Sequence, residues 1–313
     1  MAVDPRQVTI PVGAPFGIEP DAGLAAGAPL RQASLWTDAW RRYIKNQGAV
    51  IAGAVFVLIV LYCVITPFVS PYDPNHIDYA LQNQGPTWAH PLGSDNFGRD
   101  LMTRAALGGR ISIGIGFVAT LVILGIGVVY GAISGFIGGK LDNAMQRFLD
   151  ALYGLPYLPF AIITVTIIGS VNFWTMVIAL SIASWFTTAR IVRGQLITLK
   201  ENDYVRAAKA VGARWYRVVV RHLLPNTLGV LIIAIFLELP GVILGEAFLS
   251  FIGLGINPPD ASLGSMAQDG YTAYRVAPHI IVVPSLAITA IVMCTYFISD
   301  GLRDALDPRT RET

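Results

Sequence analysis

Four long stretches of this chain contain no Asp, Glu, Lys or Arg, and their length limits the folds that the chain can adopt. They cover residues 46–72, 111–139, 151–189 and 276–299. A helix needs about 20 apolar residues to cross the hydrocarbon core of a bilayer, and each stretch meets that length. Only 13% of all residues are charged, against about 25% in soluble domains. The pattern predicts a multi-spanning helical membrane protein and excludes a soluble enzyme, a disulfide scaffold and a disordered chain.

The apolar stretches predict an all-α integral membrane fold with six transmembrane helices. The stretch 151–189 is too long for one span, and residues 169–172 (Gly-Ser-Val-Asn) break it into two spans that form a tight hairpin. The other four spans are expected at residues 48–68, 111–135, 227–252 and 279–299. Six spans place both termini on the same side of the membrane.

The basic residues are distributed unevenly between the two sides of the predicted membrane. With both termini in the cytoplasm, the inner segments contain 18 of the 22 Lys and Arg residues, and the outer segments contain four. Cytoplasmic loops of membrane proteins are enriched in Lys and Arg. The charge pattern therefore predicts cytoplasmic termini in the cell membrane, with outer loops at about 69–110 and 253–278.

This topology divides the chain into parts. Residues 1–33 are rich in Pro, Ala and Gly, which predicts a disordered cytoplasmic leader. Residues 34–47 have the apolar and basic spacing of a short interfacial helix. We expect the first span and outer loop at 48–110, a five-helix core at 111–300 and a cytoplasmic tail at 301–313.

The predicted inner loop 190–225 contains eight basic residues against two acidic residues. Its charge alone is typical of a cytoplasmic loop, but its internal pattern predicts structure. Asp203 is expected to cap a short helix that contains several small residues, and Gly212 is expected to allow a turn after it. A second helix with an apolar stripe follows, and Pro225 is expected to end that helix. Two short helices across a turn would form a docking knob on the cytoplasmic side.

This loop resembles the EAA coupling loop of ABC-importer permeases. The residues that carry the resemblance are, in chain order, Ala207, Ala208, Gly212, His222 and Pro225. In that family the loop sits in a groove of the cytoplasmic ATPase and transmits its closure, so the resemblance implies this role for these residues together with Asp203. Arg206 stands where the family usually has Glu. The resemblance therefore does not imply an acidic contact with the ATPase at this position.

Further segments resemble one branch of that family, the peptide permeases. They are HPLGSDNFGRDLMTRAALGGRISIG (90–114), GFIGGKLDNAMQRFLD (135–150), GEAFLSFIGLGINPPDASLGSM (245–266) and ISDGLRDALDPRTR (298–311). The departures from the branch signatures are Ser94, Thr103 and Leu263, the last in place of a usual Trp. With these segments in order, the chain is identified as a member of the C-type permease subunits of dipeptide and oligopeptide ABC importers.

The resemblance implies the type I ABC-importer permease fold and a transport subunit rather than an enzyme. A homologous B-type permease would pair with this chain, two cytoplasmic ABC ATPases would bind below it, and an extracytoplasmic solute-binding protein would deliver substrate. The ATPases would use ATP and Mg²⁺, and no cofactor is expected on this chain. The same branch includes importers of nickel and other small solutes, and the residues do not choose between these solutes and peptides.

Two acidic residues, Glu238 and Glu246, lie inside the predicted fifth span. An Asp, Lys or Arg at the centre of a membrane helix costs about 2.5–3.5 kcal/mol, so ionisable residues in spans usually have a purpose. These acids either face a wet pathway and contact a cationic or amide-bearing substrate, or they bond a neighbouring helix or the partner permease. Both alternatives stay open from the sequence.

Charged residues also gather at the outer mouth of the second span. They are Arg99, Asp100, Arg104 and Arg110. They either form a substrate gate, with Arg99 and Asp100 as its first candidates, or pair internally to hold the outer loop. Further along the same span, Gly131 and Gly135 are four residues apart, which predicts close packing against another helix.

Other patterns do not support a different function. Residues 114–119 match a dinucleotide fingerprint only formally, because they lie in a span, and residues 134–141 lack the spacing of a P-loop. The chain is therefore expected to have no nucleotide site of its own. The four His residues are too dispersed for a metal site, and no nucleic acid is needed to explain a basic loop between two spans.

Two other classes of membrane protein, an intramembrane hydrolase and a secondary transporter, fit the sequence less well. An intramembrane hydrolase would use Glu238 and Glu246 with water, but the adjacent spans lack a second carboxylate motif. A secondary transporter would be built from inverted repeats, and the two halves of the chain show no internal similarity.

Overall fold

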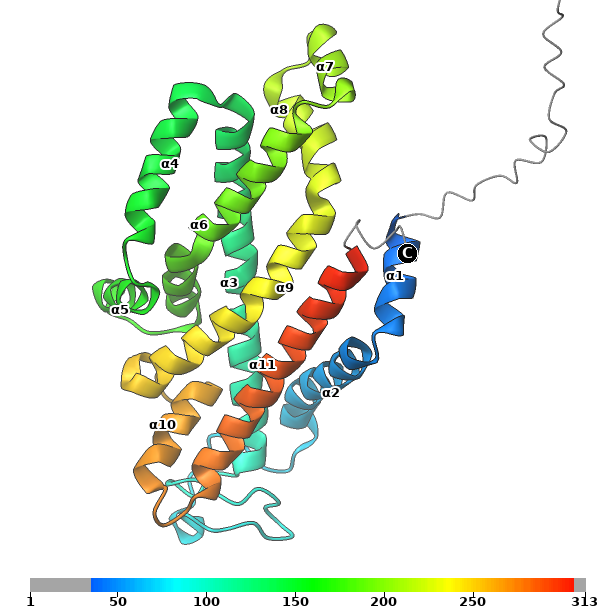
Figure 1. Ribbon diagram of the computed structural model, residues 1–313. Helices are drawn as coiled ribbons and strands as arrows, with labels where there is room; N and C mark the ends of the chain where they lie inside the picture. The colour runs from blue at the N-terminus through cyan, green and yellow to red at the C-terminus, as the bar shows by residue number, and fades with distance from the viewer. Residues whose placement is uncertain (1–34, 307–313) are drawn as a thin grey trace, which may run out of the picture.

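The computed structural model describes residues 35–306, which form helices joined by turns and loops (Figure 1). The α-helices are α1 (Leu35–Lys45), α2 (Gln47–Val69), α3 (Leu101–Ile137), α4 (Gly139–Tyr153), α5 (Tyr157–Ile168), α6 (Phe173–Leu199), α7 (Asp203–Ala210), α8 (Trp215–Val218), α9 (Leu224–Leu249), α10 (Leu263–Ala273) and α11 (His279–Leu306). Three short turns are η1 (Tyr79–Leu81), η2 (Val219–Leu223) and η3 (Ser250–Leu254). The described residues contain no strand beyond an isolated bridge between Ser94 and Asp100. The predicted leader 1–33 and residues 307–313 lie outside the described residues.

Five helices of the described chain are long and apolar enough to cross a membrane. They are α2, α3, α6, the continuous segment Trp215–Leu254 that contains α9, and α11. The helices α4 and α5 are long and apolar enough to cross a membrane only when they are taken together. Their axes meet at a bend of 89°. The predicted six spans are reached when this bent pair counts as one span. The prediction of an all-α membrane fold is confirmed.

The predicted hairpin between spans three and four is only partly correct. The break itself lies where expected: Gly169 has a φ of +79° and ends α5, and the Asn172 side chain accepts hydrogen bonds from the N–H groups of Trp174 and Thr175 at the start of α6. However, α5 has only 12 residues, a length of about 18 Å against a hydrocarbon core of about 30 Å. The charged residues of α4 are typical of a loop, yet this segment is a helix of 15 residues that meets α5 at a sharp bend.

Two other helices extend beyond their predicted ends. The second span begins at Leu101 and not at residue 111, because Arg104 in its first turns is buried beside Asp95 and does not interrupt the helix. The last helix continues to Leu306, so residues 301–306 of the predicted tail are helical. The first span, in contrast, matches its expected position closely.

The helices α3 and α6 pack closely through a row of glycines on α3. A Cβ atom added at Gly131 would lie 2.4 Å from the backbone oxygen of Ala189, and one at Gly135 would lie 2.8 Å from that of Arg193. Gly127 extends the same row toward Thr188. The packing predicted for Gly131 and Gly135 is therefore confirmed, and it lets two backbones touch where a side chain would separate them.

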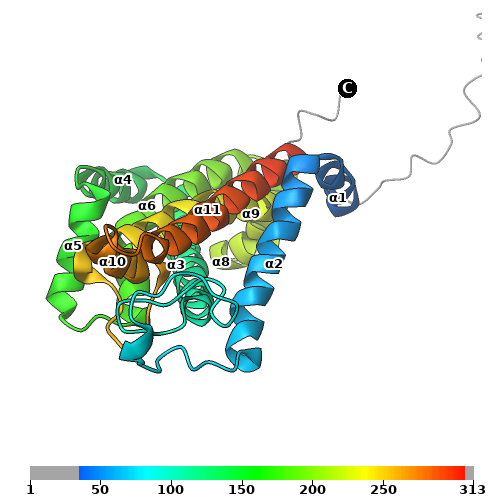
Figure 2. The ribbon, with the colours of Figure 1, turned by 90° about the horizontal axis from the view of Figure 1, so that it is seen from below.

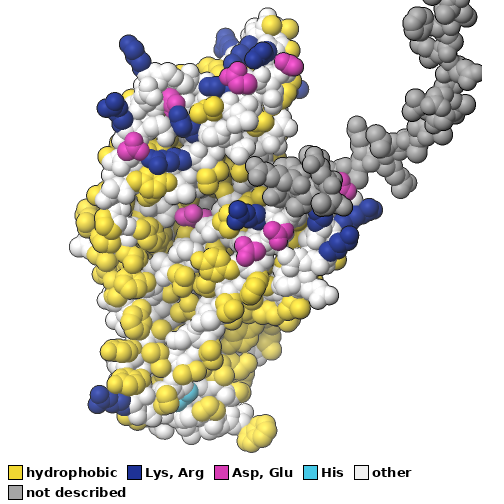
Figure 3. All heavy atoms as spheres, in the orientation of Figure 1, with side chains coloured by type: hydrophobic (Ala, Val, Ile, Leu, Met, Phe, Trp, Pro, Cys, Tyr) yellow, Lys and Arg dark blue, Asp and Glu magenta, His cyan; other side chains and the backbone are white. Residues whose placement is uncertain are grey.

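The two ends of the molecule differ in their short helices and in their charged residues. The short helices α7 and α8 lie at one end, and α10 lies at the other with the segment that joins α2 to α3 (Figure 1). Figure 2 shows α2 along the outside of the bundle, with α1 at one of its ends. On the face shown in Figure 3, Lys and Arg side chains gather toward the end that contains α7, and hydrophobic side chains cover the middle. This distribution is the one expected for a membrane protein.

Candidate functional site

The chain between α6 and α9 forms a projection at one end of the molecule, which we call the coupling projection (residues 203–223). Its inner side is apolar and packs on the end of α6. The buried residues of this cluster include Val192, Leu196, Val205, Val218, Val219 and Leu223. Because these residues fix α7 to the ends of α6 and α9, a force on α7 would reach two membrane helices directly.

The turn after α7 has the geometry that the sequence predicts. Gly212 has a φ of +79°, its N–H donates to the Lys209 oxygen (3.0 Å), and the N–H of Ala213 donates to the Ala208 oxygen (3.0 Å). A Cβ atom at Gly212 would meet nothing within 4 Å. Ala207 is exposed and Ala208 is half-buried. Glycine is therefore required here by the backbone conformation and not by crowding.

Two details of the predicted projection are wrong. Asp203 does not cap α7: the N-cap residue is Asn202, its side chain makes no capping hydrogen bond, and Asp203 is the exposed first residue of the helix. Pro225 does not end the second helix either, because it lies in the first turn of α9, directly after the wide π-helical turn η2. Proline is tolerated in a first helical turn, where its missing N–H has no partner to lose. The second predicted helix is thus the beginning of the fifth span.

The coupling projection exposes apolar, aromatic and basic residues. Val211, directly before the turn glycine, is 85% exposed, and Val220 on η2 is 64% exposed. The exposed aromatic and basic residues are Tyr204, Arg206, Lys209, Arg214, Trp215, Tyr216, Arg217 and Arg221. His222 is half-buried with its ring 6.5 Å from that of Tyr204. Sequence reasoning missed Val211, although a bulky apolar residue directly before a turn glycine is a recognisable signal.

Glu246 lies in the interior, where three helices meet. It is fully buried, and it accepts hydrogen bonds from the hydroxyls of Ser112 on α3 and Ser250, each at 2.7 Å. The Ser112 hydroxyl also accepts a hydrogen bond from the N–H of Leu263, the first residue of α10 (3.1 Å). Glu246 therefore joins α9 to α3 and to the start of α10.

Glu238 has different surroundings two turns away on α9. Its side chain is half-buried and lies near Ser184 on α6 and Tyr157 on α5. No basic side chain forms an ion pair with it among the described residues. This carboxylate is thus a partly accessible polar group inside the bundle.

The charged residues at the N-terminal end of α3 form a network with each other. Arg99 contacts Asp95 (Nε to Oδ2, 2.6 Å) and Asp269 (3.7 Å), and Arg104 contacts Asp95 (3.4 Å). Asp95, Arg99 and Arg104 are all buried. Partial burial raises the pKa of the Asp269 carboxyl, and the positive charge of Arg99 opposes that rise. The network ties the outer loop to α10.

Asp100 anchors the start of α3. Its carboxylate accepts hydrogen bonds from the N–H and the hydroxyl of Thr103 (2.8 and 2.7 Å) and contacts His90 (2.9 Å). The hydroxyl of Thr103 also bonds Ser70 at the end of α2 (2.8 Å). Arg110 stands apart from both sets of contacts because it is exposed, two turns further along α3.

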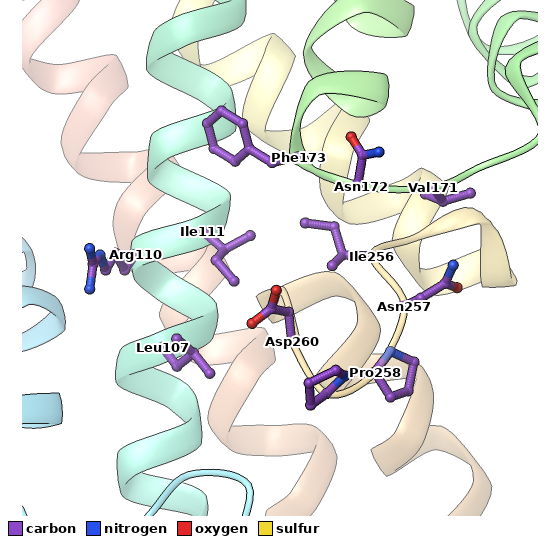
Figure 4. A pocket seen from close by; sticks show the side chains of 11 residues that line it. Leu107, Arg110, Ile111, Val171, Asn172, Phe173, Ile256, Asn257, Pro258 and Asp260 are labelled. Atoms are coloured by element: carbon purple, nitrogen blue, oxygen red, sulfur yellow. The ribbon is translucent and has the colours of Figure 1, made fainter.

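Two cavities that share a wall lie near the N-terminal end of α3. The larger one, of about 540 Å³, is shown in Figure 4. Its walls are Leu107, Arg110, Ile111, Val171, Asn172, Phe173, Ile256, Asn257, Pro258, Pro259 and Asp260. The smaller one, of about 350 Å³, borders Arg99, Arg104 and Asp269, and it shares Ile256, Asn257, Pro258 and Asp260 with the larger. The segment 256–260 therefore separates two cavities at the outer end. Within residues 35–306, no group of three or more His, Cys, Asp or Glu side chains is placed to hold a metal ion.

Comparisons with protein families and solved structures give two matches to family profiles. Residues 127–312 match the family described as binding-protein-dependent transport system inner membrane component. Residues 34–86, which include α1 and α2, match the N-terminal TM domain of oligopeptide transport permease C. Together the two matches cover most of the described chain.

Curated relatives are similar over nearly the whole length. The oligopeptide transport system permease protein OppC of Haemophilus influenzae is 40% identical over 280 residues, which cover 89% of this chain and 90% of that protein. OppC of Escherichia coli K12 is 41% identical, with 89% and 92% covered. The dipeptide transport system permease protein DppC of Bacillus subtilis is 40% identical, with 88% and 86% covered.

Solved structures show the same fold at low identity. A chain from an inward-facing structure of the MetNI methionine ABC transporter aligns with a TM-score of 0.53 and 19% identity. The alignment covers 66% of this chain and 98% of that chain. The helical arrangement is therefore that of an ABC transporter membrane subunit.

Proposed function

Since the chain belongs to the family of binding-protein-dependent transport system inner membrane components, we propose that it is the C-type membrane subunit of an ATP-driven importer of dipeptides or oligopeptides. The chain is a multi-pass membrane protein and a permease, which transports and does not catalyse a covalent reaction. The observation that supports peptides as the substrate class is the 40–41% sequence identity, over nearly the whole chain, to permeases of oligopeptide and dipeptide systems. Uptake of a labelled dipeptide by the assembled transporter, with nickel as a competitor, tests that class.

The proposed assembly needs several partners. A homologous B-type permease would complete the pathway, two cytoplasmic ATPases would bind and hydrolyse ATP with Mg²⁺, and a solute-binding protein would deliver substrate from outside. The exposed apolar surface of α2 supports a partner or lipid on that side, because only Ala49, Ala52 and Cys63 of this helix are buried. ATP binding would close the ATPase pair and switch the pathway between inward and outward openings.

The coupling projection is the proposed contact with the ATPases. Val211, which is 85% exposed at the turn after α7, suits a groove in a soluble partner, since exposed apolar residues rimmed by polar ones commonly mark interaction sites. Asp203, Ala207 and Gly212 are also exposed, whereas His222 lies closer to the start of α9. The buried contacts of Val205 with the ends of α6 and α9 support transmission of the motion.

The proposed pathway group is Glu238. A half-buried carboxylate inside a membrane bundle, without an ion-pair partner among the described residues, fits contact with a cationic or amide-bearing substrate. Glu246 is proposed to hold helices together instead, because its carboxylate is fully buried and bonded to hydroxyls of the same chain. Arg99 and Asp100 are proposed to shape the outer gate by fixing the loop before α3 and not by touching substrate.

The substitution Gly212→Leu tests the coupling role. The left-handed backbone at Gly212 strains any other residue by about 1–2 kcal/mol, but the position is open, so the chain should still insert and assemble. We expect ATP hydrolysis to persist while uptake falls by about tenfold or more, since a bulky side chain would separate the two docked surfaces. The measurement is uptake and ATPase activity of the same proteoliposomes.

Gly169→Leu is the matched control for Gly212→Leu. Gly169 has the same φ of +79° and is also open, but it ends α5 and lies outside the coupling projection. It should leave the ratio of uptake to hydrolysis unchanged. Normal uptake with Gly212→Leu would overturn the coupling assignment.

A further inference from the structure

A contact between Asp142 on α4 and Arg193 on α6 lies close to the coupling projection. Asp142 is buried in the first turn of α4. Its carboxylate accepts two hydrogen bonds from the guanidinium of Arg193, one from Nε (2.6 Å) and one from a terminal nitrogen (2.7 Å). Arg193 directly follows Val192, one of the α6 residues on which the coupling projection packs. A movement of the projection that shifts this end of α6 would therefore displace the guanidinium that holds α4.

The surroundings of this pair fix its orientation. The hydroxyl of Ser134, near the end of α3, donates to the Asp142 carboxylate and accepts a hydrogen bond from the amide of Gln146 on α4 (2.9 Å). The α6 backbone is close to α3 at the same place, because a Cβ atom at Gly135 would lie 2.8 Å from the Arg193 oxygen. A guanidinium and a carboxylate joined by two parallel hydrogen bonds form a strong and directional contact. The pair therefore determines how α4 is oriented on α6.

The helix α4 has few other contacts with the bundle. Of its 15 residues, only Asp142 and Leu149 are buried, and Leu149 packs on α6. A second ion pair joins Asp150 of α4 to Arg190 of α6, but these side chains are 66% and 39% exposed. Exposed ion pairs contribute little to stability. Within residues 35–306, the buried pair is thus the main polar contact between α4 and α6.

The helix α4 leads to the group proposed for the pathway. Figure 1 shows α4 beginning at the end of the molecule that contains α7 and leading to α5. The first residue of α5 is Tyr157, which lies near Glu238. The Tyr157 hydroxyl is also so close to α9 that a Cβ atom at Gly245 would lie 2.5 Å from it. A shift of α4 and α5 would therefore change the surroundings of Glu238.

We propose that the Asp142–Arg193 pair is a positioning contact that transmits movement of the coupling projection to α4 and α5, and so to the pathway at Glu238. This inference rests on the proposed import function. When the projection moves with the ATPases, the end of α6 displaces the guanidinium, the carboxylate follows it, and α5 moves relative to α9. Without the pair, α4 keeps only its apolar and exposed contacts with α6, so ATP hydrolysis continues while α5 stays in place.

The first test compares peptide uptake with ATP hydrolysis in proteoliposomes that contain the assembled transporter. Asp142→Asn keeps the size of the side chain and an acceptor for Ser134 but removes the charge, and Arg193→Gln removes the guanidinium. Each should lower the number of peptides imported per ATP by about tenfold, a size typical of one charge-assisted contact between coupled parts. The double variant should lower it no further, because both substitutions remove the same contact.

A purely structural role of the pair predicts a different result. Loss of assembled transporter would lower uptake and hydrolysis together and leave their ratio unchanged, and that outcome would overturn the proposal. Asp150→Asn is the matched control, since it removes the exposed ion pair between the same two helices. Its ratio should stay within about twofold of the unsubstituted value. A loss as large as that of Asp142→Asn would overturn the assignment to the buried pair.

The second test measures movement of α5 directly and does not depend on the substrate. Spin labels on Ile167→Cys in α5 and Trp40→Cys in α1 report a distance across the molecule, since α5 and α1 lie on opposite sides in Figures 1 and 2. The two positions are 78% and 63% exposed, whereas the native Cys63 and Cys294 are buried and should take up little label. The distance should differ between the nucleotide-free and the ATP–vanadate-trapped transporter. Asp142→Asn should remove this difference.

The outcomes of the second test separate the contact from the substrate. Asp150→Asn should keep the change in distance. An unchanged distance in the unsubstituted transporter, or the same change in Asp142→Asn, would overturn the proposal. If the unsubstituted transporter imports no peptide but its distance change still depends on Asp142, the proposed substrate class fails and the positioning role is supported.

Discussion

The two acidic residues of α9 differ at the scale of single side chains, and the difference predicts opposite effects of substituting them. Glu246 is fully buried and accepts hydrogen bonds from two serine hydroxyls. Replacing it with Leu leaves those hydroxyls without an acceptor in the interior, which should lower the free energy of unfolding by about 2–4 kcal/mol. Glu246→Gln keeps one acceptor oxygen and should lose about 1 kcal/mol. Melting temperatures of the purified protein in detergent measure both effects, and a Glu246→Leu variant that melts like the unsubstituted protein would contradict this role.

Glu238→Gln should show the opposite pattern. The side chain is half-buried and has no ion pair among the described residues that the change would break, so stability should change by about 0.5 kcal/mol or less. Uptake of cationic peptides should fall by about tenfold if the carboxylate faces the pathway, with ATPase activity retained. Uptake equal to that of the unsubstituted transporter for peptides of every charge would exclude Glu238 from the pathway.

Sequence reasoning reached these residues but not their contacts. A carboxylate in an apolar run is visible in the sequence, whereas Ser112, the hydrogen-bond partner of Glu246, comes from a helix far away in the chain. The same limit applies at the outer mouth. The sequence showed alternating acids and bases before α3, and only the fold shows that Arg99 and Arg104 share Asp95.

At the scale of elements, the row of glycines on α3 determines how closely α6 approaches. Gly131→Ala would place a methyl group 2.4 Å from the Ala189 oxygen, so one helix must move. We expect a loss of about 1–3 kcal/mol, the range typical of overpacking, and a clearly lower melting temperature. Gly125→Ala on the same helix meets nothing within 4 Å and should be neutral or slightly stabilising. Equal melting temperatures for the two variants would show that the α3–α6 contact is loose.

A helix can be located from the sequence when its position depends only on the residues within it. Uncharged runs locate the spans because bilayer length is a local requirement, and the first span was predicted almost to the residue. Prediction failed where contacts with distant residues determine the position of a helix. The charged helix α4 is held to α6 by paired hydrogen bonds between Asp142 and Arg193 (2.6 and 2.7 Å), which no local pattern shows. The continuity of the fifth span through Pro225 depends on the wide turn before it.

At the scale of the whole molecule, the uneven distribution of basic residues predicts which end faces the cytoplasm, and a topology experiment can test it. Val211 in the coupling projection and Val276 after α10 are 85% and 80% exposed, and they lie at opposite ends of the molecule. If the basic end is cytoplasmic, a membrane-impermeant thiol reagent should label Val276→Cys in cells with an intact cytoplasmic membrane and should leave Val211→Cys unlabelled. After permeabilisation, both cysteines should react at similar rates, since both positions are open to solvent. Labelling of Val211→Cys before permeabilisation would place the coupling projection outside, where no ATP is available, and would remove the physical basis of the proposed energy coupling.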